Sequence, residues 1–431
     1  MFSSSDNLAT RIRRSDPEAL ARVASRLIPM RNDNLVERPW GGERLLAYKG
    51  LSARGGKRFG EAFEIAAFDQ DAETAAHPSI ARLADGSEIP LPELLAAAGP
   101  AILGADHFSR HGARIPLLPK TLEVKELLSL QTHPPGYPEL YVVIEADEGA
   151  TLRLGLRHDV DRTALGQRLE RGRKLQEDLL RQLRRDTDQA DLHAAFSEAL
   201  SRGAADGDVV RGVERWARDE SGHAELASGA ARLLRLQREI IDLLHAIPVR
   251  AGQVIYNAVP AAREDAQRAL PSAEVHALGN PEGREILLLE IRLPCRTYRA
   301  WDNIRFPLRD LETDRALDAM SERGSEPAGF VVEPQPTRGR PGMFRSVVNA
   351  AFAVDHLRPG LGAPVEEPTS ERVRTLHAIN GSVEISSAEG QLLGSLARGQ
   401  SALVPASLAP YFVVASDESD APEMVQVTLL S

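Results

Sequence analysis

Two side chains in the run Ser129-Leu130-Gln131-Thr132-His133-Pro134 have the spacing of metal ligands. Gln131 and His133 lie two positions apart, so in a β-strand both side chains project from the same face. Glu139 follows after a short turn of proline and glycine, and His276 lies far downstream between two strand-like runs. One amide, one carboxylate and two imidazoles form a mixed nitrogen and oxygen set. Such a set suits zinc or a similar divalent ion, with a position left open for substrate.

Each of these residues also has a structural interpretation. Gln131 is then an ordinary hydrogen-bonded strand residue, and His133 and His276 are histidines whose hydrogen bonds are satisfied at the surface or in the core. For any one residue taken alone, the structural interpretation is the more common one. The metal site therefore depends on the sequence around these residues.

Several short motifs surround the candidate ligands in a fixed order. Residues 38–42 read Arg-Pro-Trp-Gly-Gly, residues 60–65 read Gly-Glu-Ala-Phe-Glu-Ile, and residues 116–120 read Pro-Leu-Leu-Pro-Lys. The Gln-x-His-Pro motif follows, and later come Leu-Leu-Leu-Glu-Ile at 287–291 and Thr-Tyr-Arg at 297–299. In this order the motifs resemble those of type I mannose-6-phosphate isomerase (phosphomannose isomerase), a zinc cupin family. The resemblance covers residues 31 to 155 and 247 to 310.

The resemblance implies a metal site and a set of substrate contacts. The residues that match the family's metal ligands are Gln131, His133, Glu139 and His276, so one Zn²⁺ per chain is expected. Arg299 matches the family's catalytic arginine. Lys120 matches a pocket lysine that would bind phosphate or, if desolvated, move a proton. Ser129 is a candidate hydrogen-bond donor to the phosphate, and Glu64 and Glu290 are expected to orient the ligands.

The implied activity is a metal-dependent aldose-ketose isomerisation that interconverts mannose 6-phosphate and fructose 6-phosphate through an enediol. Such a reaction needs an electrophile at the oxygens, a group that moves a proton and an anchor for the phosphate. The alternative is a cupin that keeps the metal but binds a sugar or sugar phosphate in a regulatory role. Lys120 together with Arg299 favours the enzyme. Tyr137 stands where the family has a pocket lysine, which favours the binding protein.

Composition limits the partners and the compartment. The chain has 431 residues, a net charge of -10 and a single cysteine, Cys295. One cysteine fits a reducing compartment, and no stretch approaches the ~20 apolar residues of a membrane span, so a cytoplasmic protein without a membrane partner is expected. The negative charge disfavours nucleic acid. The expected partner is a small-molecule sugar phosphate, and the oligomeric state is left open.

Pattern and resemblance together predict a mainly β fold with two cupin (jelly-roll) domains and an α-helical insertion domain. The expected units are an N-terminal helical extension (1–30), a catalytic metal-binding cupin (31–157 and 247–340), the α-helical insertion (158–246) and a C-terminal metal-free cupin-like domain (341–431). Strands are expected from Leu45 to about Phe68, and a helix from Pro90 to near Pro100. The insertion has amphipathic leucine stripes and is expected to form a small bundle that the barrel hardly needs.

Overall fold

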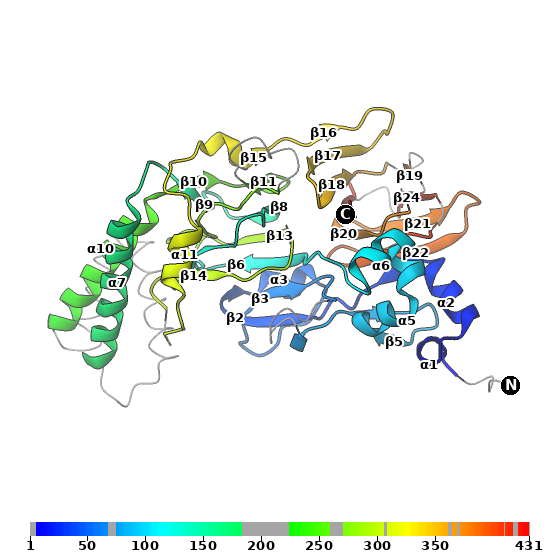
Figure 1. The fold of residues 1–431 in the computed structure, drawn as a ribbon, viewed down its shortest axis with the longest axis horizontal. Helices are drawn as coiled ribbons and strands as arrows, with labels where there is room; N and C mark the ends of the chain where they lie inside the picture. Colours follow the sequence, from blue (N-terminus) through cyan, green and yellow to red (C-terminus); the bar gives the residue numbers. More distant parts are fainter. Residues whose placement is uncertain are drawn as a thin grey trace.

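The protein is mainly β, with several antiparallel sheets and helices at both ends of its long axis (Figure 1). The computed structural model describes residues 6–67, 75–182, 224–258, 270–305, 308–360, 364–368, 371–408, 410–416 and 421–430. Helices α7 (Arg162–Gln182) and α10 (Ala224–Ile241) lie at one end of the molecule in Figure 1, and the C-terminal sheets lie at the other.

Two antiparallel sheets carry the predicted site residues. The larger has seven strands in the order β15 (Val331–Val332), β11 (Val254–Asn257), β8 (Glu139–Ala146), β13 (Ile286–Arg292), β6 (Lys120–Val124), β3 (Phe59–Phe63) and β2 (Leu35–Gly42). The smaller has five strands in the order β10 (Leu244–Pro248), β9 (Thr151–Leu156), β12 (His276–Ala277), β7 (Leu130–Thr132) and β14 (Tyr298–Trp301). Leu122 and Tyr141 of the larger sheet share one apolar core with Leu152 and Leu154 of the smaller. The two sheets therefore pack face to face, and β8 is buried from Glu139 to Ile144.

Two further sheets form the C-terminal part. One has the order β1 (Ile28–Pro29), β23 (Ser401–Val404), β20 (Arg374–Asn380), β25 (Glu423–Leu429), β18 (Phe352–Leu357), β17 (Met343–Val348) and β16 (Gln335–Pro336). The other has the order β19 (Val365–Glu367), β24 (Tyr411–Ala415), β21 (Val383–Ser387) and β22 (Leu392–Leu396). The C-terminal region expected to be cupin-like is thus built of antiparallel strands. The expected helical extension at 1–30 also contains a strand, because Ile28 pairs with Leu403.

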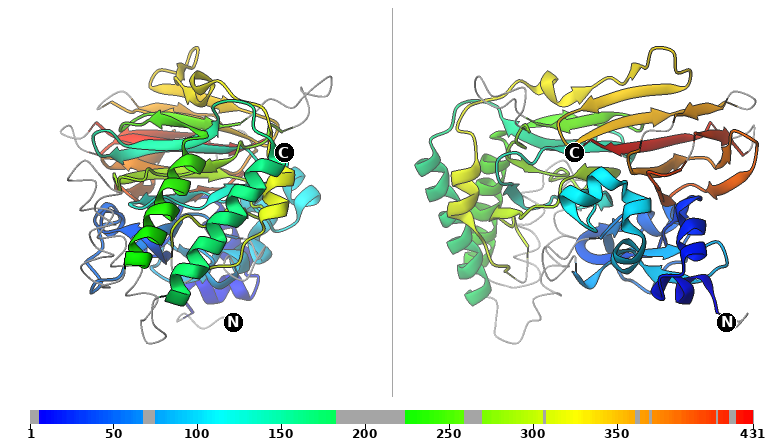
Figure 2. Two further views of the ribbon diagram at one scale, coloured as in Figure 1. Left: turned by 90° about the vertical axis from the view of Figure 1, so that its left-hand side faces the viewer. Right: turned by 45° about the vertical axis from the view of Figure 1, so that its right-hand side comes forward.

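Three helices near the N-terminus pack together beside the C-terminal sheets (Figure 2). They are α1 (Leu8–Arg13), α2 (Pro17–Ala24) and α5 (Leu91–Leu103). Asp16 caps α2, since its side chain accepts hydrogen bonds from the N–H groups of Glu18 and Ala19. The expected end of α5 near Pro100 is wrong. The helix continues for three residues beyond this proline and ends at Leu103, and it is followed by Gly104, whose φ of 87° favours glycine. It is followed by α6 (Ala105–His111).

The prediction of strands from Leu45 to Phe68 is partly wrong. β3 lies in this range, but Arg44–Tyr48 form a short helix, α3. Both carboxylate oxygens of Glu123 accept hydrogen bonds of 2.8 Å, one from the N–H of Arg44 and one from the N–H of Leu45. A side chain distant in sequence thus accepts hydrogen bonds from two N–H groups in the first turn of the helix. Local sequence could not reveal this. Residues 68–74 lie outside the described part of the chain.

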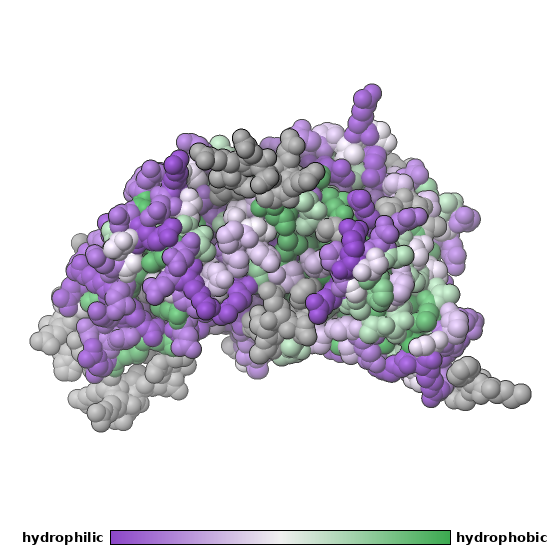
Figure 3. All heavy atoms as spheres, viewed as in Figure 1, coloured by the Kyte–Doolittle hydropathy of each residue, from purple (hydrophilic) through white to green (hydrophobic). Residues whose placement is uncertain are grey.

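The two described helices of the insertion pack on the smaller site sheet as well as on each other. Residues 183–223 lie outside the described residues, but α7 and α10 contact each other and share a core with Leu130, Leu156 and Trp301 of the smaller site sheet. This packing is visible at the end of the sheet in Figure 2, and the faces of both helices turned to the viewer in Figure 3 are largely hydrophilic. The leucine-rich faces of α7 and α10 therefore pack against the sheet as well as against each other.

Glu64 does not orient the metal ligands as the sequence suggested. Its buried carboxylate pairs with Lys49 and accepts a hydrogen bond of 2.7 Å from Ser401 of β23. His377 of β20 joins the network through a contact of 2.8 Å between its Nδ1 and the hydroxyl of Ser401. Glu64 thus links the N-terminal half of the chain to a C-terminal sheet.

Shorter elements complete the described structure. They are β4 (Ile80–Arg82), β5 (Glu88–Pro90), α11 (Thr313–Ala319) and the 3-10 helix η1 (Pro327–Phe330). None of the helices in the described ranges combines the length and the apolar character that crossing a membrane requires.

Candidate metal and substrate site

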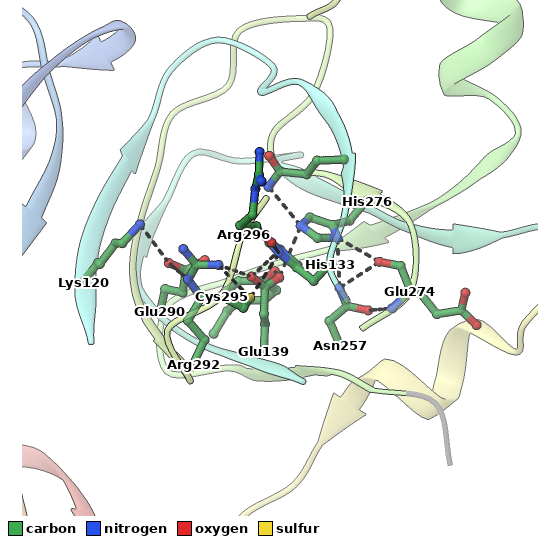
Figure 4. Close-up of polar contacts among 12 residues, drawn as sticks. Lys120, His133, Glu139, Asn257, Glu274, His276, Glu290, Arg292, Cys295 and Arg296 are labelled. Atoms are coloured by element: carbon green, nitrogen blue, oxygen red, sulfur yellow. Dashed lines mark hydrogen bonds and ion pairs between the residues drawn. The ribbon is translucent and has the colours of Figure 1, made fainter. Parts of the chain in front are cut away.

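Strand pairing brings three of the four predicted ligands into one buried cluster (Figure 4). His133 follows β7, Glu139 begins β8 and His276 begins β12. His133 Nε2 lies 2.8 Å from Glu139 Oε1, and His276 Nε2 lies 3.2 Å from Glu139 Oε2. All three side chains are almost fully buried. One potential ligand atom from each residue lies within 4.8 Å of the others, which is a separation that one metal ion can bridge.

Backbone carbonyl groups fix the orientation of both imidazoles. His133 Nδ1 donates to the carbonyl of Arg296 over 3.1 Å, and His276 Nδ1 donates to the carbonyl of Glu274 over 2.8 Å. A carbonyl can only accept, so each Nδ1 carries a proton and each Nε2 is left to bind a cation at the cluster. Asn257 lies beside the hydrogen bond of His276, and its side-chain nitrogen donates to the same carbonyl of Glu274 over 3.3 Å. In Figure 4 the carboxylate of Glu274 points away from the cluster.

The cluster needs a cation at its centre. His133 Nε2 and Glu139 Oε1 are buried and make no hydrogen bond to any described residue, although they are 2.8 Å apart. A neutral imidazole nitrogen and a carboxylate oxygen are both acceptors, so they attract each other only through a proton or a metal ion. Burial disfavours a charged imidazole, but the nearby Glu139 carboxylate outweighs it and raises the pKa of His133 to about 10. A proton therefore occupies this place in the metal-free protein.

Gln131, the fourth predicted ligand, lies at the edge of the cluster. Its side-chain nitrogen is 3.0 Å from His276 Nε2, and its oxygen accepts a hydrogen bond of 3.1 Å from Ser129. In this orientation the amide nitrogen faces the cluster. Turning the amide over would present the oxygen, which is the atom that binds metals. Ser129 thus contacts Gln131 directly.

The donor set and its surroundings fit a divalent ion such as zinc. Two imidazoles and one carboxylate are a known set for catalytic zinc with an open position. The phenol of Tyr141 donates a hydrogen bond of 2.5 Å to Glu139 Oε2. Burial opposes the charged carboxylate, but His133 and His276 hold the pKa of Glu139 well below its usual range. Glu139 is therefore ionised and available to a metal.

A cavity of about 580 Å³ opens beside the cluster. The predicted site residues that line it are His133, Glu139, Gln131, Ser129, Lys120 and Arg299. His276 is fully buried and does not line it. Among the described residues, the lining contains six basic side chains, which are Arg38, Lys120, Arg292, Arg296, Arg299 and Arg309. It contains four acidic ones, which are Glu61, Glu139, Glu290 and Glu312. The cavity is therefore positive in a chain whose net charge is -10, and a divalent ion would make it more so.

Directly paired residues on neighbouring strands explain how the inner wall is assembled, because paired side chains project from the same face. One row of the larger sheet consists of Asn257, Glu139 and Arg292. The next row on that face contains Tyr141, Glu290, Lys120 and Phe63. The predicted lysine and the predicted metal carboxylate therefore lie in adjacent rows of one sheet.

Lys120 lies between two carboxylates. Its Nζ is 3.8 Å from Glu61 Oε2 and 3.9 Å from Glu290 Oε2. Burial disfavours charge on both carboxylates. For Glu61 the attraction of Lys120 and Arg38 prevails and lowers the pKa to about 2, whereas burial prevails for Glu290 and raises its pKa. The two carboxylates beside Lys120 thus differ in how readily they take up a proton.

Arg299 lies at a basic part of the wall. Its Nη1 is 3.5 Å from the carbonyl of Asp310, and its Nε makes no hydrogen bond to a described residue. Nearby, Arg309 donates to Asp302 over 2.5 Å from its Nε. Burial first and then the charge of Arg309 lower the pKa of Arg299. A guanidinium destabilised in this way favours an anionic ligand.

Several residues of the site were not predicted from the sequence. They are Arg292 and Tyr141, which contact Glu139, together with Asn257 beside His276 and Arg309 beside Arg299. The period of two offered a signal for two of them: Tyr141 is two positions from Glu139 and Arg292 two from Glu290, so each shares its neighbour's face. No local pattern marks Asn257 or Arg309.

Solved structures with a similar fold are phosphomannose isomerases. The structure of mannose 6-phosphate isomerase from Bacillus subtilis superimposes with a TM-score of 0.58 at 18% identity, covering 93% of this chain and 99% of that chain. A histidine-to-glutamine variant of phosphomannose isomerase from Salmonella typhimurium gives a TM-score of 0.59 at 14% identity, covering 94% and 100%. No protein-family model and no curated protein sequence matches the chain. At these identities the likeness shows a common fold.

Proposed function

We propose that the protein is a zinc-dependent sugar-phosphate isomerase that interconverts mannose 6-phosphate and fructose 6-phosphate. The observation that carries the proposal is the buried cluster of His133, Glu139 and His276 at the wall of a cavity that also contains Lys120 and Arg299. The structures with a similar fold are named mannose 6-phosphate isomerase and phosphomannose isomerase, which supports the same assignment.

The charge of the cavity supports an anionic substrate. Six basic side chains face four acidic ones, and a divalent ion would add two positive charges. A sugar phosphate carries a charge of about -1.5 to -2 near neutral pH. The volume of about 580 Å³ lies within the range of roughly 300–1,000 Å³ that is typical of small-molecule sites.

The proposed mechanism distributes three tasks among the residues of the cavity. A zinc ion bound by the cluster and by the oxygen of Gln131 would act as a Lewis acid. Glu290 and Lys120 are placed to move the proton between the two reacting carbons, because they adjoin in one row and burial raises the pKa of Glu290. Arg299 stabilises the negative charge of the enediolate. Ser129 holds Gln131 and is a candidate donor to the phosphate.

We further propose that the two pairs of sheets are two cupin domains, the second without metal, and that residues 158–246 are an insertion into the first. The face-to-face packing of the two site sheets supports this division. Tyr137 packs against an apolar core and is absent from the cavity lining, so it supplies no charge in place of the family's lysine.

A coupled assay on mannose 6-phosphate tests the proposal. Protein stripped of metal should be inactive, and added zinc should restore both activity and about one bound ion per chain. Glu139→Gln keeps the shape of the side chain but removes its charge, and should lose the ion. The matched control Glu367→Gln changes a buried glutamate of the C-terminal sheets and should keep it. Stoichiometric zinc with no turnover would favour the regulatory sugar-binding protein instead.

A further inference from the structure

Arg292 is a buried arginine in the wall of the cavity, and neither the metal cluster nor the proposed proton transfer uses it. It ends β13 directly opposite Glu139 of β8. Its Nη1 lies 3.7 Å from Glu139 Oε1, and its Nε lies 3.6 Å from Glu290 Oε2. Figure 4 shows the guanidinium between these two carboxylates.

The charge of Arg292 is compensated, but its hydrogen-bond donors are largely unused. The two carboxylates lie beyond hydrogen-bond length, and Nε makes no hydrogen bond to any described residue. Within the described part of the chain, the side chain's only hydrogen bond runs from Nη1 to Cys295 Sγ at 3.5 Å. A guanidinium has five N–H donors and sulfur is a weak acceptor. Leaving such donors unsatisfied inside a protein costs free energy, so the arrangement favours a ligand that supplies oxygen acceptors.

The position of Arg292 determines which oxygens it would meet. It adjoins Glu139 in the row that carries the metal cluster, and Glu290 precedes it by two positions on the same face. A ligand atom between Arg292 and the cluster would belong to the part of the sugar where the reaction takes place. Arg299 belongs to the other sheet, on β14.

We propose that Arg292 is a substrate-contacting residue, whose unused guanidinium donors bind the oxygens of the reacting carbons of a sugar phosphate beside the metal cluster. The inference rests on the proposed function and adds to it a second guanidinium at the developing negative charge. Arginine suits this place because it stays charged and presents its donors as a rigid planar fork.

Two substitutions separate the charge of Arg292 from its donors. Arg292→Lys keeps the positive charge but loses the planar fork, and Arg292→Gln loses the charge and keeps a neutral amide donor. The matched control is Arg374→Gln. Arg374 is a buried strand arginine near Glu367 in the C-terminal sheet, 3.9 Å away, and it lies outside the cavity lining. Bound zinc, thermal unfolding and the steady-state constants on mannose 6-phosphate would be measured for all four proteins.

Both Arg292 variants should keep about one zinc ion and lower kcat by ~100-fold, with a smaller change in KM, because the contact strengthens as charge develops. The control should keep the kcat of the wild type. A folded, zinc-loaded Arg292→Gln protein with a kcat within about threefold of the wild type would overturn the proposal. So would loss of zinc from both Arg292 variants, since Arg292 would then act on the metal ligands alone.

Binding of mannitol 1-phosphate separates this inference from the proposed function. This compound is the reduced form of mannose 6-phosphate and cannot isomerise. Isothermal titration should show binding weakened by ~10-fold in Arg292→Gln and unchanged in Arg374→Gln. If the wild type does not isomerise mannose 6-phosphate, the proposed function fails. The titration alone then shows whether Arg292 contacts the sugar phosphate. Equal affinity of the wild type and Arg292→Gln for mannitol 1-phosphate, or no binding by either protein, would overturn the proposed role of Arg292.

Discussion

The indole N–H of Trp301 donates a hydrogen bond of 2.7 Å to the side-chain oxygen of Gln176. This bond ties α7 to β14, the strand that also carries Arg299. The amide nitrogen of Gln176 in turn donates to the carbonyl of Asn303 over 2.7 Å. A methyl group placed on Gly172 would lie 3.1 Å from the indole ring, so the helix approaches the ring closely. The helical segment is therefore part of the wall that supports the site.

Replacing residues 162–241 with a short Gly/Ser linker should destabilise the protein and reduce its metal content. The deletion uncovers Trp301, Leu130 and Leu156, and burying each such side chain contributes about 1.5–3 kcal/mol.

Gln176→Ala should lower the free energy of unfolding by about 1–3 kcal/mol, since it leaves the indole N–H of Trp301 buried without an acceptor. The control Lys174→Ala changes a largely exposed side chain and should have little effect. Urea unfolding and metal analysis would measure both, and a stable, zinc-loaded deletion protein would show the helices to be dispensable.

Zinc binding should displace a proton from His133. The Glu139 carboxylate raises the pKa of His133 to about 10 against its burial, so the imidazole of the metal-free protein is protonated at neutral pH. A metal ligand must be neutral, so the apparent affinity should rise by about tenfold per pH unit until the pH exceeds this pKa. Calorimetry at pH 7 in buffers of different ionisation enthalpy should report about one released proton. Zero released protons would show that His133 is already neutral.

Arg299→Ala should lower turnover without removing the metal. Its guanidinium faces the cavity but contacts none of the cluster residues, so the loss falls on stabilisation of negative charge and should reach ~100-fold or more in kcat. Arg299→Lys restores a charge without the fork and should recover part of this loss. The surface variant Arg284→Ala serves as the control. If Arg299→Ala turns over as fast as the wild type, Arg299 has no role in catalysis. Its contact with the carbonyl of Asp310 would then be structural.

Acid should loosen the contact between the N-terminal half and the C-terminal sheets. Burial lowers the pKa of His377 to about 4, below its ordinary value near 6.5. Between these values the unfolded chain binds a proton that the folded protein does not, so stability is complete above pH 6.5 and falls as the pH drops towards 4. The loss amounts to at most about 3 kcal/mol. His377→Gln should flatten the curve of unfolding free energy against pH across this window. An unchanged slope would assign the acid sensitivity to other groups.

Sequence identified the parts of the site that depend on a short range of residues. The period of two indicated that Gln131 and His133 share a face, and the family resemblance added Glu139 and His276; the structure brings His133, Glu139 and His276 together, with Gln131 beside His276. The spacing from Glu290 indicates the face of Arg292, but its position opposite Glu139 depends on strand register, which is set by long-range pairing.

Long-range contacts also explain the errors in the predicted fold. The helix α3 is capped by Glu123, which lies 79 positions from Arg44. Glu64 resembles a ligand-orienting residue in sequence, but its side chain pairs with Lys49 and Ser401. The leucine stripes of α7 show that the helix buries one face, and they cannot show whether that face meets another helix or a sheet.

The pairing of Ile28 with Leu403 joins segments that lie far apart in the chain. On the ribosome, β1 emerges long before its partner strand β23. Until then the strand edge of β1 and the side chain of Leu27, which packs in the core of the C-terminal sheets, lack these native partners, so this stretch is prone to misfolding. A chain that stops before residue 400 would keep this edge of β1 unpaired.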